Sequence, residues 1–204
     1  MLTSPYHQEQ HEAILMASTH IDTLSPDQIE ALRTSSCEYL MFRDDVDAFL
    51  NTYFATICTK KCFHNNLSAC CSREGIITFF ADIVINALFS TLDEQKFLLT
   101  VLQKPNTGPK CVYLGPQGCL WRIKPIVCQM FICDAAMIRI FPDNPTAESA
   151  WNVLKNREKQ FTWPDKKVLF DDMEAFFINA GHASSLMYLH NSPGLLLVKK
   201  RAGL

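Results

Sequence analysis

Residues 111–133 read CVYLGPQGCLWRIKPIVCQMFIC and hold four cysteines around a glycine–proline turn. Four more cysteines occur upstream in residues 58–71, CTKKCFHNNLSACC. The ninth cysteine, Cys37, lies in residues 1–57, and residues 134–204 contain none. Because short loops can present several sulfurs to one ion at little cost in chain entropy, we expect a ligand of these thiols to organise the cysteine-rich segment.

Helix signals precede this segment. Residues 25–28, Ser-Pro-Asp-Gln, form a capping box with proline at the first helical position, which predicts a helix to about Ser35. Apolar residues at helical spacing predict a second helix over residues 45–57. Cys37 lies alone before that helix, and we expect it to be a small buried apolar residue.

The middle of the chain alternates helices and loops. Residues 78–89 are apolar enough for a buried helix, and Thr91 with Glu94 forms a capping box for a helix to about Gln103. The turn at residues 115–118 predicts a small hairpin. A short helix from about Pro125 is expected to carry Cys128, and also Cys133 if it extends that far.

Three helices are predicted in the C-terminal part. The first begins near Thr146, the second covers residues 168–180 and ends at Gly181, and the third ends before Asn191. For residues 195–198 a small strand or a packed tail is expected.

These signals predict a mainly α fold, in which a helical core carries an irregular cysteine-rich metal-binding segment and at most a small hairpin. The length of 204 residues suits one domain. Within residues 1–204 we therefore expect N-terminal helices over 1–57, an eight-cysteine metal-binding region over 58–133 and C-terminal helices over 134–204.

Composition excludes several classes of protein. Apolar residues make up 48% and charged residues 20% of the chain, which excludes wholesale disorder. The net charge of −2 gives no reason to expect a nucleic-acid partner. The longest apolar stretch, residues 77–89, is interrupted by Asp82 and Asn86 and is too short to span a bilayer. Without a visible secretory signal, we expect a cytoplasmic protein with no membrane partner.

Nine cysteines cannot all pair within one chain, and thiols stay reduced in the cytoplasm, so clustered cysteines there favour metal binding over disulfides. Thiolate is a soft ligand that suits zinc, iron–sulfur clusters and copper(I). Eight thiolates can complete two four-thiolate zinc sites, or four of them can hold one iron–sulfur cluster. The eight candidate metal ligands are Cys58, Cys62, Cys70, Cys71, Cys111, Cys119, Cys128 and Cys133.

The adjacent pair Cys70 and Cys71 constrains how the thiols are shared. Neighbouring side chains diverge in a helix and in a strand, so both rarely reach one ion. The pair therefore serves two neighbouring metals, or one member binds metal while the other is buried. Cys58 and Cys62 would share one face if they lie on a helix.

The histidines are weaker candidates. His64 follows Cys62 by two residues, and we expect it to be solvated or to orient a ligand rather than to bind metal. His182 and His190 have no partner that the sequence reveals. His7, His11 and His20 are expected on the surface of a mobile N-terminus.

The pattern resembles the zinc- or iron-chelating family named for its CxxCxxCC motif, the YkgJ-like proteins. The opening cysteine group ends in a Cys-Cys pair, as in that family, and Cys111-Val-Tyr-Leu is similar to its Cys-x-x-Leu element. Residues 118–121, Gly-Cys-Leu-Trp, correspond to Gly-Cys-x-Ile-Tyr, and residues 124–131, KPIVCQMF, correspond to Arg-Pro-x-x-Cys-Arg-x-Phe. The resemblance covers about residues 58–133.

This chain departs from the family pattern in three ways, the first of which is a spacing from Cys119 to Pro125 that is one residue shorter. The gaps in the opening motif are three and seven residues instead of two and two. Lys124 and Gln129 replace the two arginines, so the bidentate fork that a guanidinium provides is lost from the motif. Any role that those arginines have in the family, in binding a ligand or orienting the site, is therefore not assigned to Lys124 and Gln129.

The resemblance and the thiols together predict a metal-binding protein that chelates zinc or iron through clustered cysteines. The alternative is an iron–sulfur redox protein or an accessory module of a protein-modifying enzyme. No catalytic residue is assigned, because the acidic pairs Asp44-Asp45 and Asp171-Asp172 sit beside predicted helix starts, where carboxylates favour the positive end of the helix dipole. A metal ion is the expected partner, and a protein partner is left open.

Overall fold

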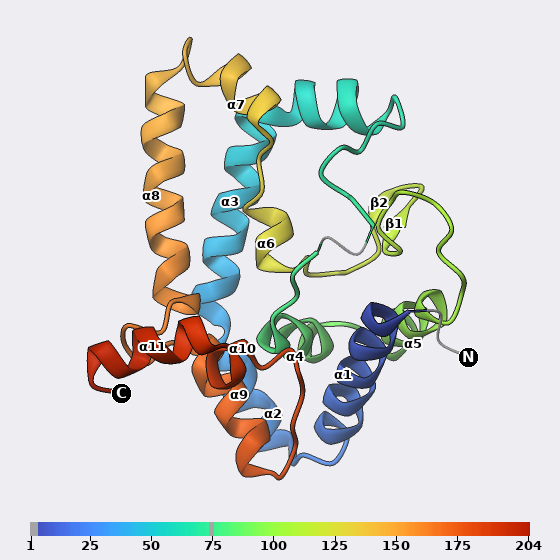
Figure 1. Ribbon diagram of the computed structural model, residues 1–204, viewed down its shortest axis with the longest axis vertical. Coiled ribbons are helices and arrows are strands. Elements are labelled where there is room, and N and C mark those ends of the chain that lie inside the picture. The colour runs from blue at the N-terminus through green and yellow to red at the C-terminus, as the bar shows by residue number, and fades with distance from the viewer. Residues whose placement is uncertain (1–3, 74–75) are drawn as a thin grey trace.

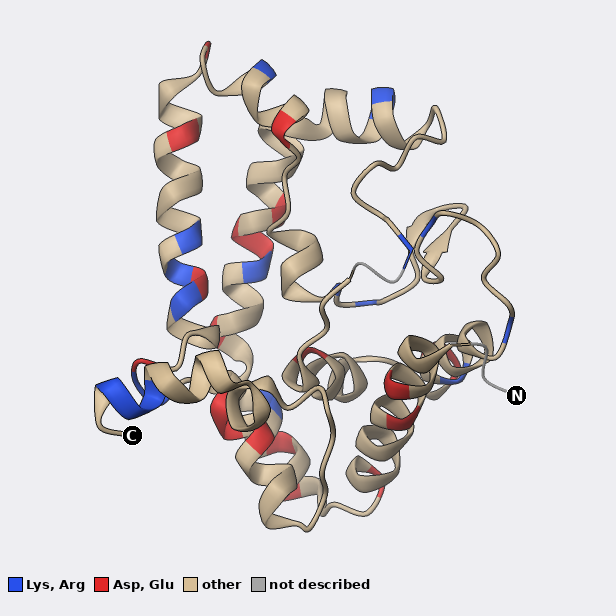
Figure 2. Ribbon diagram, in the orientation of Figure 1, with Lys and Arg blue, Asp and Glu red and all other residues tan. Residues whose placement is uncertain are grey.

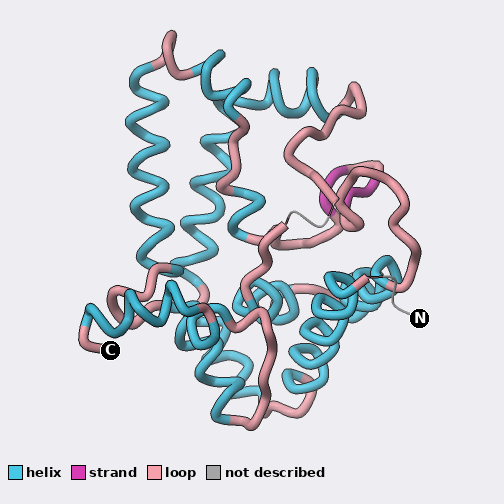
Figure 3. The backbone as a smooth tube through the Cα atoms, in the orientation of Figure 1, coloured by secondary structure: helices cyan, strands magenta, loops and turns pink. Residues whose placement is uncertain are grey.

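The computed structural model describes residues 4–73 and 76–204, and the chain is mainly α-helical there, as the sequence predicts (Figures 1 and 3). A single two-stranded antiparallel hairpin accompanies the helices in these residues. The elements are α1 (Pro5–Ile21), α2 (Pro26–Ser35), α3 (Cys37–Ala55), the π-helix η1 (Thr56–Phe63), α4 (Phe80–Phe89), α5 (Leu92–Leu102), β1 (Leu114–Gly115), β2 (Gly118–Cys119), α6 (Ile126–Gln129), α7 (Asp134–Ile140), α8 (Pro145–Thr162), α9 (Leu169–Asn179), α10 (Tyr188–Asn191) and α11 (Pro193–Ala202).

Helix α4 is the centre of the core. Its residues from Phe80 to Leu88 are all buried, and α1, α2 and α9 pack against it. Aromatic side chains supply much of the contact, and the rings of Phe80 and Phe177 meet edge to face at 5.0 Å. The prediction of a buried helix is confirmed, with the helix covering residues 80–89 instead of 78–89.

Residues 5–21 form a helix with a buried face, so the prediction of a mobile N-terminus is wrong for this part of the chain. Ser4 caps α1 by accepting a hydrogen bond from the backbone N–H of His7, and Pro5 occupies the first turn. His7 is buried, and its Nδ1 lies 3.0 Å from the backbone oxygen of Leu102 at the end of α5. The apolar face of α1 against α4 and α5 provides the burial that orders the segment.

Helix α2 begins and ends as predicted, with both hydrogen bonds of its capping box formed. Helix α3 begins at Cys37, eight residues before the predicted start, because its apolar face already includes Tyr39 and Phe42. Cys37 is exposed rather than buried, which contradicts the sequence-based expectation. The longer helix also places Asp44 and Asp45 in its middle, not at its start.

The C-terminal helices close the other side of the core. Helix α8 packs along α3 (Figure 1), and α9 contacts both α8 and α10. Gly181 follows α9 with a φ of 86°, the left-handed conformation expected after a helix. Residues 195–198 lie within the helix α11 instead of the expected small strand or packed tail, because Pro193 opens a helix there.

The eight clustered cysteines lie in residues 56–73 and 103–133, on either side in sequence of the central helix α4, and Tyr113, Trp121 and Ile126 of the second stretch are buried in the core. In Figure 1, η1 extends from the end of α3, and the hairpin of β1 and β2 lies across from it on the same side of the molecule. Most of the loop in the structure occurs in this part (Figure 3). No helix among the described residues is long and apolar enough to cross a lipid bilayer.

Candidate metal centre

One cavity collects cysteines from both sequence groups. It has a volume of about 400 Å³, and Cys70 and Cys71 of the first group line it together with Cys111, Cys119 and Cys128 of the second. The other residues around it are Thr59, Phe63, His64, Ile76, Tyr113, Leu114, Gln117, Gly118 and Lys124. Thiols that are up to 58 positions apart in the sequence therefore share one space.

The first two cysteines lie on the π-helix η1 that continues α3. Cys58 and Cys62 are four residues apart on this wider helix, so they are still neighbours along its surface. The chain then folds back, and the backbone N–H of Leu67 donates to the oxygen of Cys62 at 2.9 Å. The N–H of Ala69 lies 3.4 Å from the Cys62 sulfur, which brings the start of the Cys70-Cys71 pair to that thiol.

A short backbone ladder joins the two cysteine groups. Ser72 forms a bridge with Lys110, and the N–H of Cys111 donates to the oxygen of Cys71 at 3.0 Å. The hairpin then returns the chain, with Cys119 paired to Leu114. The bridge brings the backbone of Cys71 to that of Cys111, and both residues line the same cavity as Cys119.

Two buried polar side chains of α4 hold the loop that leads to Cys128. Asn86 Oδ1 accepts a hydrogen bond from the N–H of Ile123 at 3.0 Å, and Asp82 Oδ1 accepts one from the N–H of Ile126 at 3.0 Å. Both are almost completely buried. They anchor the first residues of α6, the four-residue helix that carries Cys128.

An arginine from α3 completes this anchor. Arg43 is buried, and its guanidinium donates to the side chain of Gln129, to the hydroxyl of Tyr39 at 2.7 Å and to the backbone oxygen of Lys124 at 2.5 Å. The Tyr39 hydroxyl in turn donates to Asp82 Oδ1 at 3.4 Å. A guanidinium thus lies beside Lys124 and Gln129, the two positions where the family motif has arginines.

The thiols influence one another electrostatically. The hydrogen bond between the neighbouring thiols lowers the pKa of Cys70 to about 6 and raises the pKa of Cys71, and the charges of Lys110 and Lys124 also favour the Cys70 thiolate. Burial raises the pKa of Cys111 to about 11 and that of Cys128 to about 12. A cation would displace protons from the thiols that stay protonated, so binding would release protons.

The surroundings of the thiols are basic. Residues 56–73 and 103–133 contain no aspartate or glutamate. In Figure 2 most acidic residues lie on the helices, whereas basic residues also occur along these loops. A centre of four thiolates around a divalent ion carries a net negative charge, which nearby cations stabilise. The basic residues in these two ranges are Lys60, Lys61, Arg73, Lys104, Lys110, Arg122 and Lys124.

The donor chemistry of the cavity fits zinc or an iron–sulfur cluster, because sulfur is the ligand that both prefer. The cysteine sulfurs are not gathered around a single point. In residues 4–73 and 76–204, no three side chains of cysteine, histidine, aspartate or glutamate are arranged so that they could hold one metal ion. Side-chain and loop adjustment would therefore accompany binding.

The histidines and the acidic pair considered from the sequence lie at the edge of the cysteine-lined cavity or away from it. His64 lines the cavity. His190 lies on α10, and its Nδ1 is 2.8 Å from Oε2 of Glu174, a partner that the sequence does not reveal. His182 packs edge to face against His20 at 4.6 Å. Asp171 and Asp172 occupy the first turn of α9, as expected of carboxylates that stabilise a helix start.

Sequence reasoning did not find the residues that support the cavity. Arg43 and Tyr39 lie in a region assigned to the N-terminal helices, and nothing local marks them as neighbours of Cys128. Asp82 and Asn86 did carry a signal, since they are the polar residues of an otherwise apolar helix. A buried polar residue needs a partner, and here that partner is the loop before α6.

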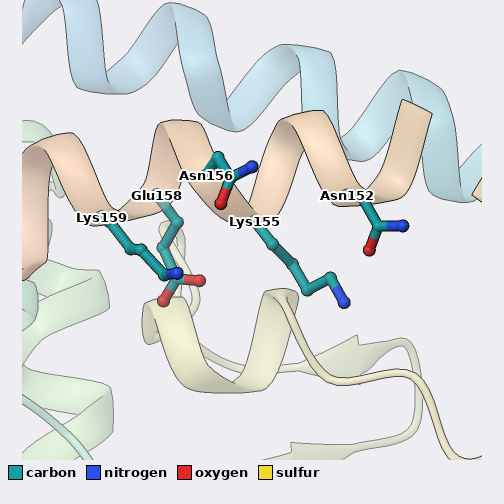
Figure 4. Close-up of a pocket in the computed structure, with 5 residues that line it drawn as sticks. All are labelled: Asn152, Lys155, Asn156, Glu158 and Lys159. Atoms are coloured by element: carbon teal, nitrogen blue, oxygen red, sulfur yellow. The ribbon is translucent and has the colours of Figure 1, made fainter. Parts of the chain in front are cut away.

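A second cavity lies on α8, away from the cysteines. Its volume is about 330 Å³, and all five lining residues belong to that helix (Figure 4). They are Asn152, Lys155, Asn156, Glu158 and Lys159. A row of solvated polar side chains on one helix explains this surface without a bound ligand.

Comparison of the chain with known proteins found no similar protein. No family model, no curated protein and no solved structure matches the chain.

Proposed function

We propose that the protein binds zinc or iron through its clustered cysteine thiolates. The observation that carries this proposal is the cavity in which five cysteines from two distant parts of the chain meet. Two further observations support it: all nine cysteines are free thiols, and the loops around the cavity are basic. Free thiols also fit the expected reducing, cytoplasmic environment.

The chain's own residues would act as ligands and as their support. The eight clustered cysteines are the candidate ligands, and the hydrogen bonds from Arg43, Asp82 and Asn86 fix the loop before Cys128. A bound zinc ion would supply structural cross-linking, whereas an iron–sulfur cluster would supply one-electron chemistry. The resemblance to the CxxCxxCC family agrees with either metal.

A redox or accessory iron–sulfur protein is the second candidate. The observation in its favour is the size of the cavity, because about 400 Å³ exceeds what one ion among four sulfurs requires. An accessory role beside a protein-modifying enzyme would place the partner at this open face. The structure assigns no catalytic side chain to the cavity.

Metal analysis with an absorbance spectrum, on protein purified without oxygen, tests the proposal. One or two zinc ions per chain and a flat visible spectrum would support thiolate zinc sites. Iron, inorganic sulfide and a broad band near roughly 400 nm would support the iron–sulfur alternative. Purified protein without metal, which also takes up neither zinc nor iron with sulfide, would refute metal binding by these thiols.

A further inference from the structure

The C-terminal helix α11 is attached to the surface of the core by one face. None of its ten residues, all of which the structure describes, is buried. Helix α11 packs on α10, Leu195 contacts the core, and Lys199 pairs with Asp171 in the first turn of α9. Because Leu195 and Lys199 are one turn apart, they mark the face of α11 that is turned toward the protein.

The opposite face of α11 combines leucines with cations. Leu196 and Leu197 are 40% and 47% exposed, and the exposed Lys200 and Arg201 follow them by one turn. Residues 175–204 contain no aspartate or glutamate, and in Figure 2 this last helix is basic. An amphipathic helix of this kind fits an apolar groove with an acidic rim.

A groove with an apolar lining lies between α2 and α9 of the same protein. Its volume is about 300 Å³, and Ala31 and Leu32 of α2 line it together with Met173 and Phe176 of α9. Asp172 also lines the groove. The apolar side chains of Leu196 and Leu197 therefore have a surface of matching character on this chain.

The two helices that form the groove are acidic. Residues 22–38 contain four carboxylates and one arginine, and residues 168–180 contain three carboxylates and no lysine or arginine. Asp172 already pairs with Lys167 at 3.1 Å, whereas Asp27 and Glu30 of α2 are exposed. Asp27 and Glu30 thus provide an acidic rim, whose charge is opposite to that of the outer face of α11.

The groove and α11 are neighbours, because both border the first turn of α9. Asp171 pairs with Lys199 of α11, and the next residue, Asp172, lines the groove. Two adjacent and complementary surfaces can both be covered when a two-fold axis relates two copies, since each copy then contributes its helix and receives that of the other. This symmetry doubles the area that one ten-residue helix can bury.

We infer that the protein forms a two-fold dimer in which α11 of each copy lies in the groove between α2 and α9 of the other. Leu196 and Leu197 enter the groove, and Lys200 and Arg201 meet the carboxylates of α2. This dimer does not depend on metal binding. It leaves the cysteine-lined cavity accessible, because α11 and the hairpin of β1 and β2 lie on opposite sides of the molecule in Figure 1.

Sedimentation velocity of the full-length protein from about 1 to about 100 μM tests for the dimer. A reducing agent and a chelator exclude disulfide and metal bridges between copies. The wild type should change from one chain to two as the concentration rises. Leu197→Ser should remain a single chain, whereas Leu92→Ser, which replaces a leucine of α5 that is 59% exposed, should dimerise as the wild type does.

Charge reversal tests which surfaces meet. The variants Lys200→Glu/Arg201→Glu and Asp27→Lys/Glu30→Lys should each remain a single chain. Their equimolar mixture should form dimers, because the acidic α11 of the first variant meets the basic rim of the second, and the other contact keeps its natural charges. The control Lys96→Glu/Lys104→Glu changes two exposed lysines at α5 and should dimerise as the wild type does. Circular dichroism checks that each variant is folded.

Each contrary outcome overturns the dimer. A wild type that stays a single chain at every concentration does so, and sedimentation of that monomer with phosphatidylserine vesicles but not with phosphatidylcholine vesicles would assign the outer face of α11 to a lipid surface instead. A dimer that persists in Leu197→Ser, or a mixture of the two charge variants that stays monomeric, also overturns it. None of these outcomes bears on the proposed function, which metal content tests separately.

Discussion

The guanidinium of Arg43 donates a hydrogen bond of 2.5 Å to the backbone oxygen of Lys124, across 81 positions of sequence. This bond connects helix α3 to the loop that precedes Cys128. The same guanidinium contacts Gln129, the residue after that cysteine. Helix α3 thereby fixes the direction in which α6 presents its thiol.

Replacement Arg43→Met should destabilise the protein by about 3 to 5 kcal/mol, because it leaves the buried Asp82–Tyr39 pair without its nearest positive charge. Urea unfolding of the metal-free protein measures this loss. Arg43→Lys keeps the positive charge but not the guanidinium with its several donors, so its loss of stability should be smaller than that of Arg43→Met but still measurable. The exposed Arg139→Met is the control, with a change of no more than about 0.5 kcal/mol. Equal losses in the two methionine variants would contradict the role of Arg43.

Gly118 supports a second prediction. Its φ of 112° is a conformation that side chains with a Cβ rarely adopt, although nothing lies within 4 Å of where a Cβ would be. Gly118→Ala should therefore cost about 1 to 3 kcal/mol through the backbone alone and weaken the hairpin that pairs Cys119 with Leu114. Its metal affinity should fall with its stability.

Gly194→Ala is the matched control for that substitution. Gly194 lies in the first turn of α11, has no left-handed φ, and its nearest neighbour to a new Cβ is Ser192 Oγ at 3.9 Å. Alanine favours a helix over glycine by about 1 kcal/mol, so thermal unfolding should shift upward or not at all. A Gly118→Ala variant as stable as Gly194→Ala would show that the turn tolerates a Cβ.

The sequence sufficed for most helices and for the hairpin, since capping boxes and the glycine–proline turn are local signals. The helix over 26–35 follows from its capping box, and the buried helix of residues 78–89 follows from continuous apolar character. The early start of α3 was missed because its first turns carry only part of the apolar pattern. The helix α11 was missed because Leu195–Val198 has the apolar character of a strand.

The support of the candidate centre could not be predicted in the same way. Arg43, Tyr39 and Asp82 meet through contacts between α3 and α4 that no local pattern encodes. The burial of His7 likewise depends on the packing of α1 against α5. The presence of a histidine near the start of the sequence does not predict this packing. The joining of the two cysteine groups was open in the sequence, because no local pattern predicts the pairing of Ser72 with Lys110.

Metal and stability should be linked. Cys58→Ser, Cys62→Ser, Cys119→Ser and Cys128→Ser should each lower both metal content and thermal stability, because metal that binds only the folded state stabilises it by about 2.7 kcal/mol at a concentration one hundred times its Kd. Differential scanning calorimetry with and without a chelator measures the effect. Cys37→Ser should match the wild type in both conditions, since Cys37 is exposed at the start of α3. Unchanged metal content in all four variants would contradict the assignment.

A polar cluster away from the cysteines should make stability depend on pH. Glu174 is completely buried, and one of its oxygens lies 2.8 Å from His190 Nδ1 while the other accepts the N–H of Leu189 at 3.3 Å. Asp171 lies 3.4 Å from His190 Nε2 and also pairs with Lys199 of α11. The cluster therefore joins α9, α10 and α11.

Burial raises the pKa of Glu174 to about 8 from an ordinary value of 4.5, so the folded state favours its protonated form. The stability that this provides is complete below about pH 4.5 and is lost as the pH rises through about 8. Burial lowers the pKa of His190, so protonation of this histidine below its ordinary pKa of 6.5 opposes folding.

The variant Glu174→Gln keeps a hydrogen-bonding group and removes the titration of the carboxyl group. Between pH 6.5 and 8.5 the free energy of unfolding of the wild type should fall more steeply than that of Glu174→Gln, by up to about 1.4 kcal/mol per pH unit. Urea unfolding across this range measures the difference, with the exposed Glu148→Gln expected to follow the wild type. Parallel curves for the wild type and Glu174→Gln would show that Glu174 does not hold its proton in the folded state.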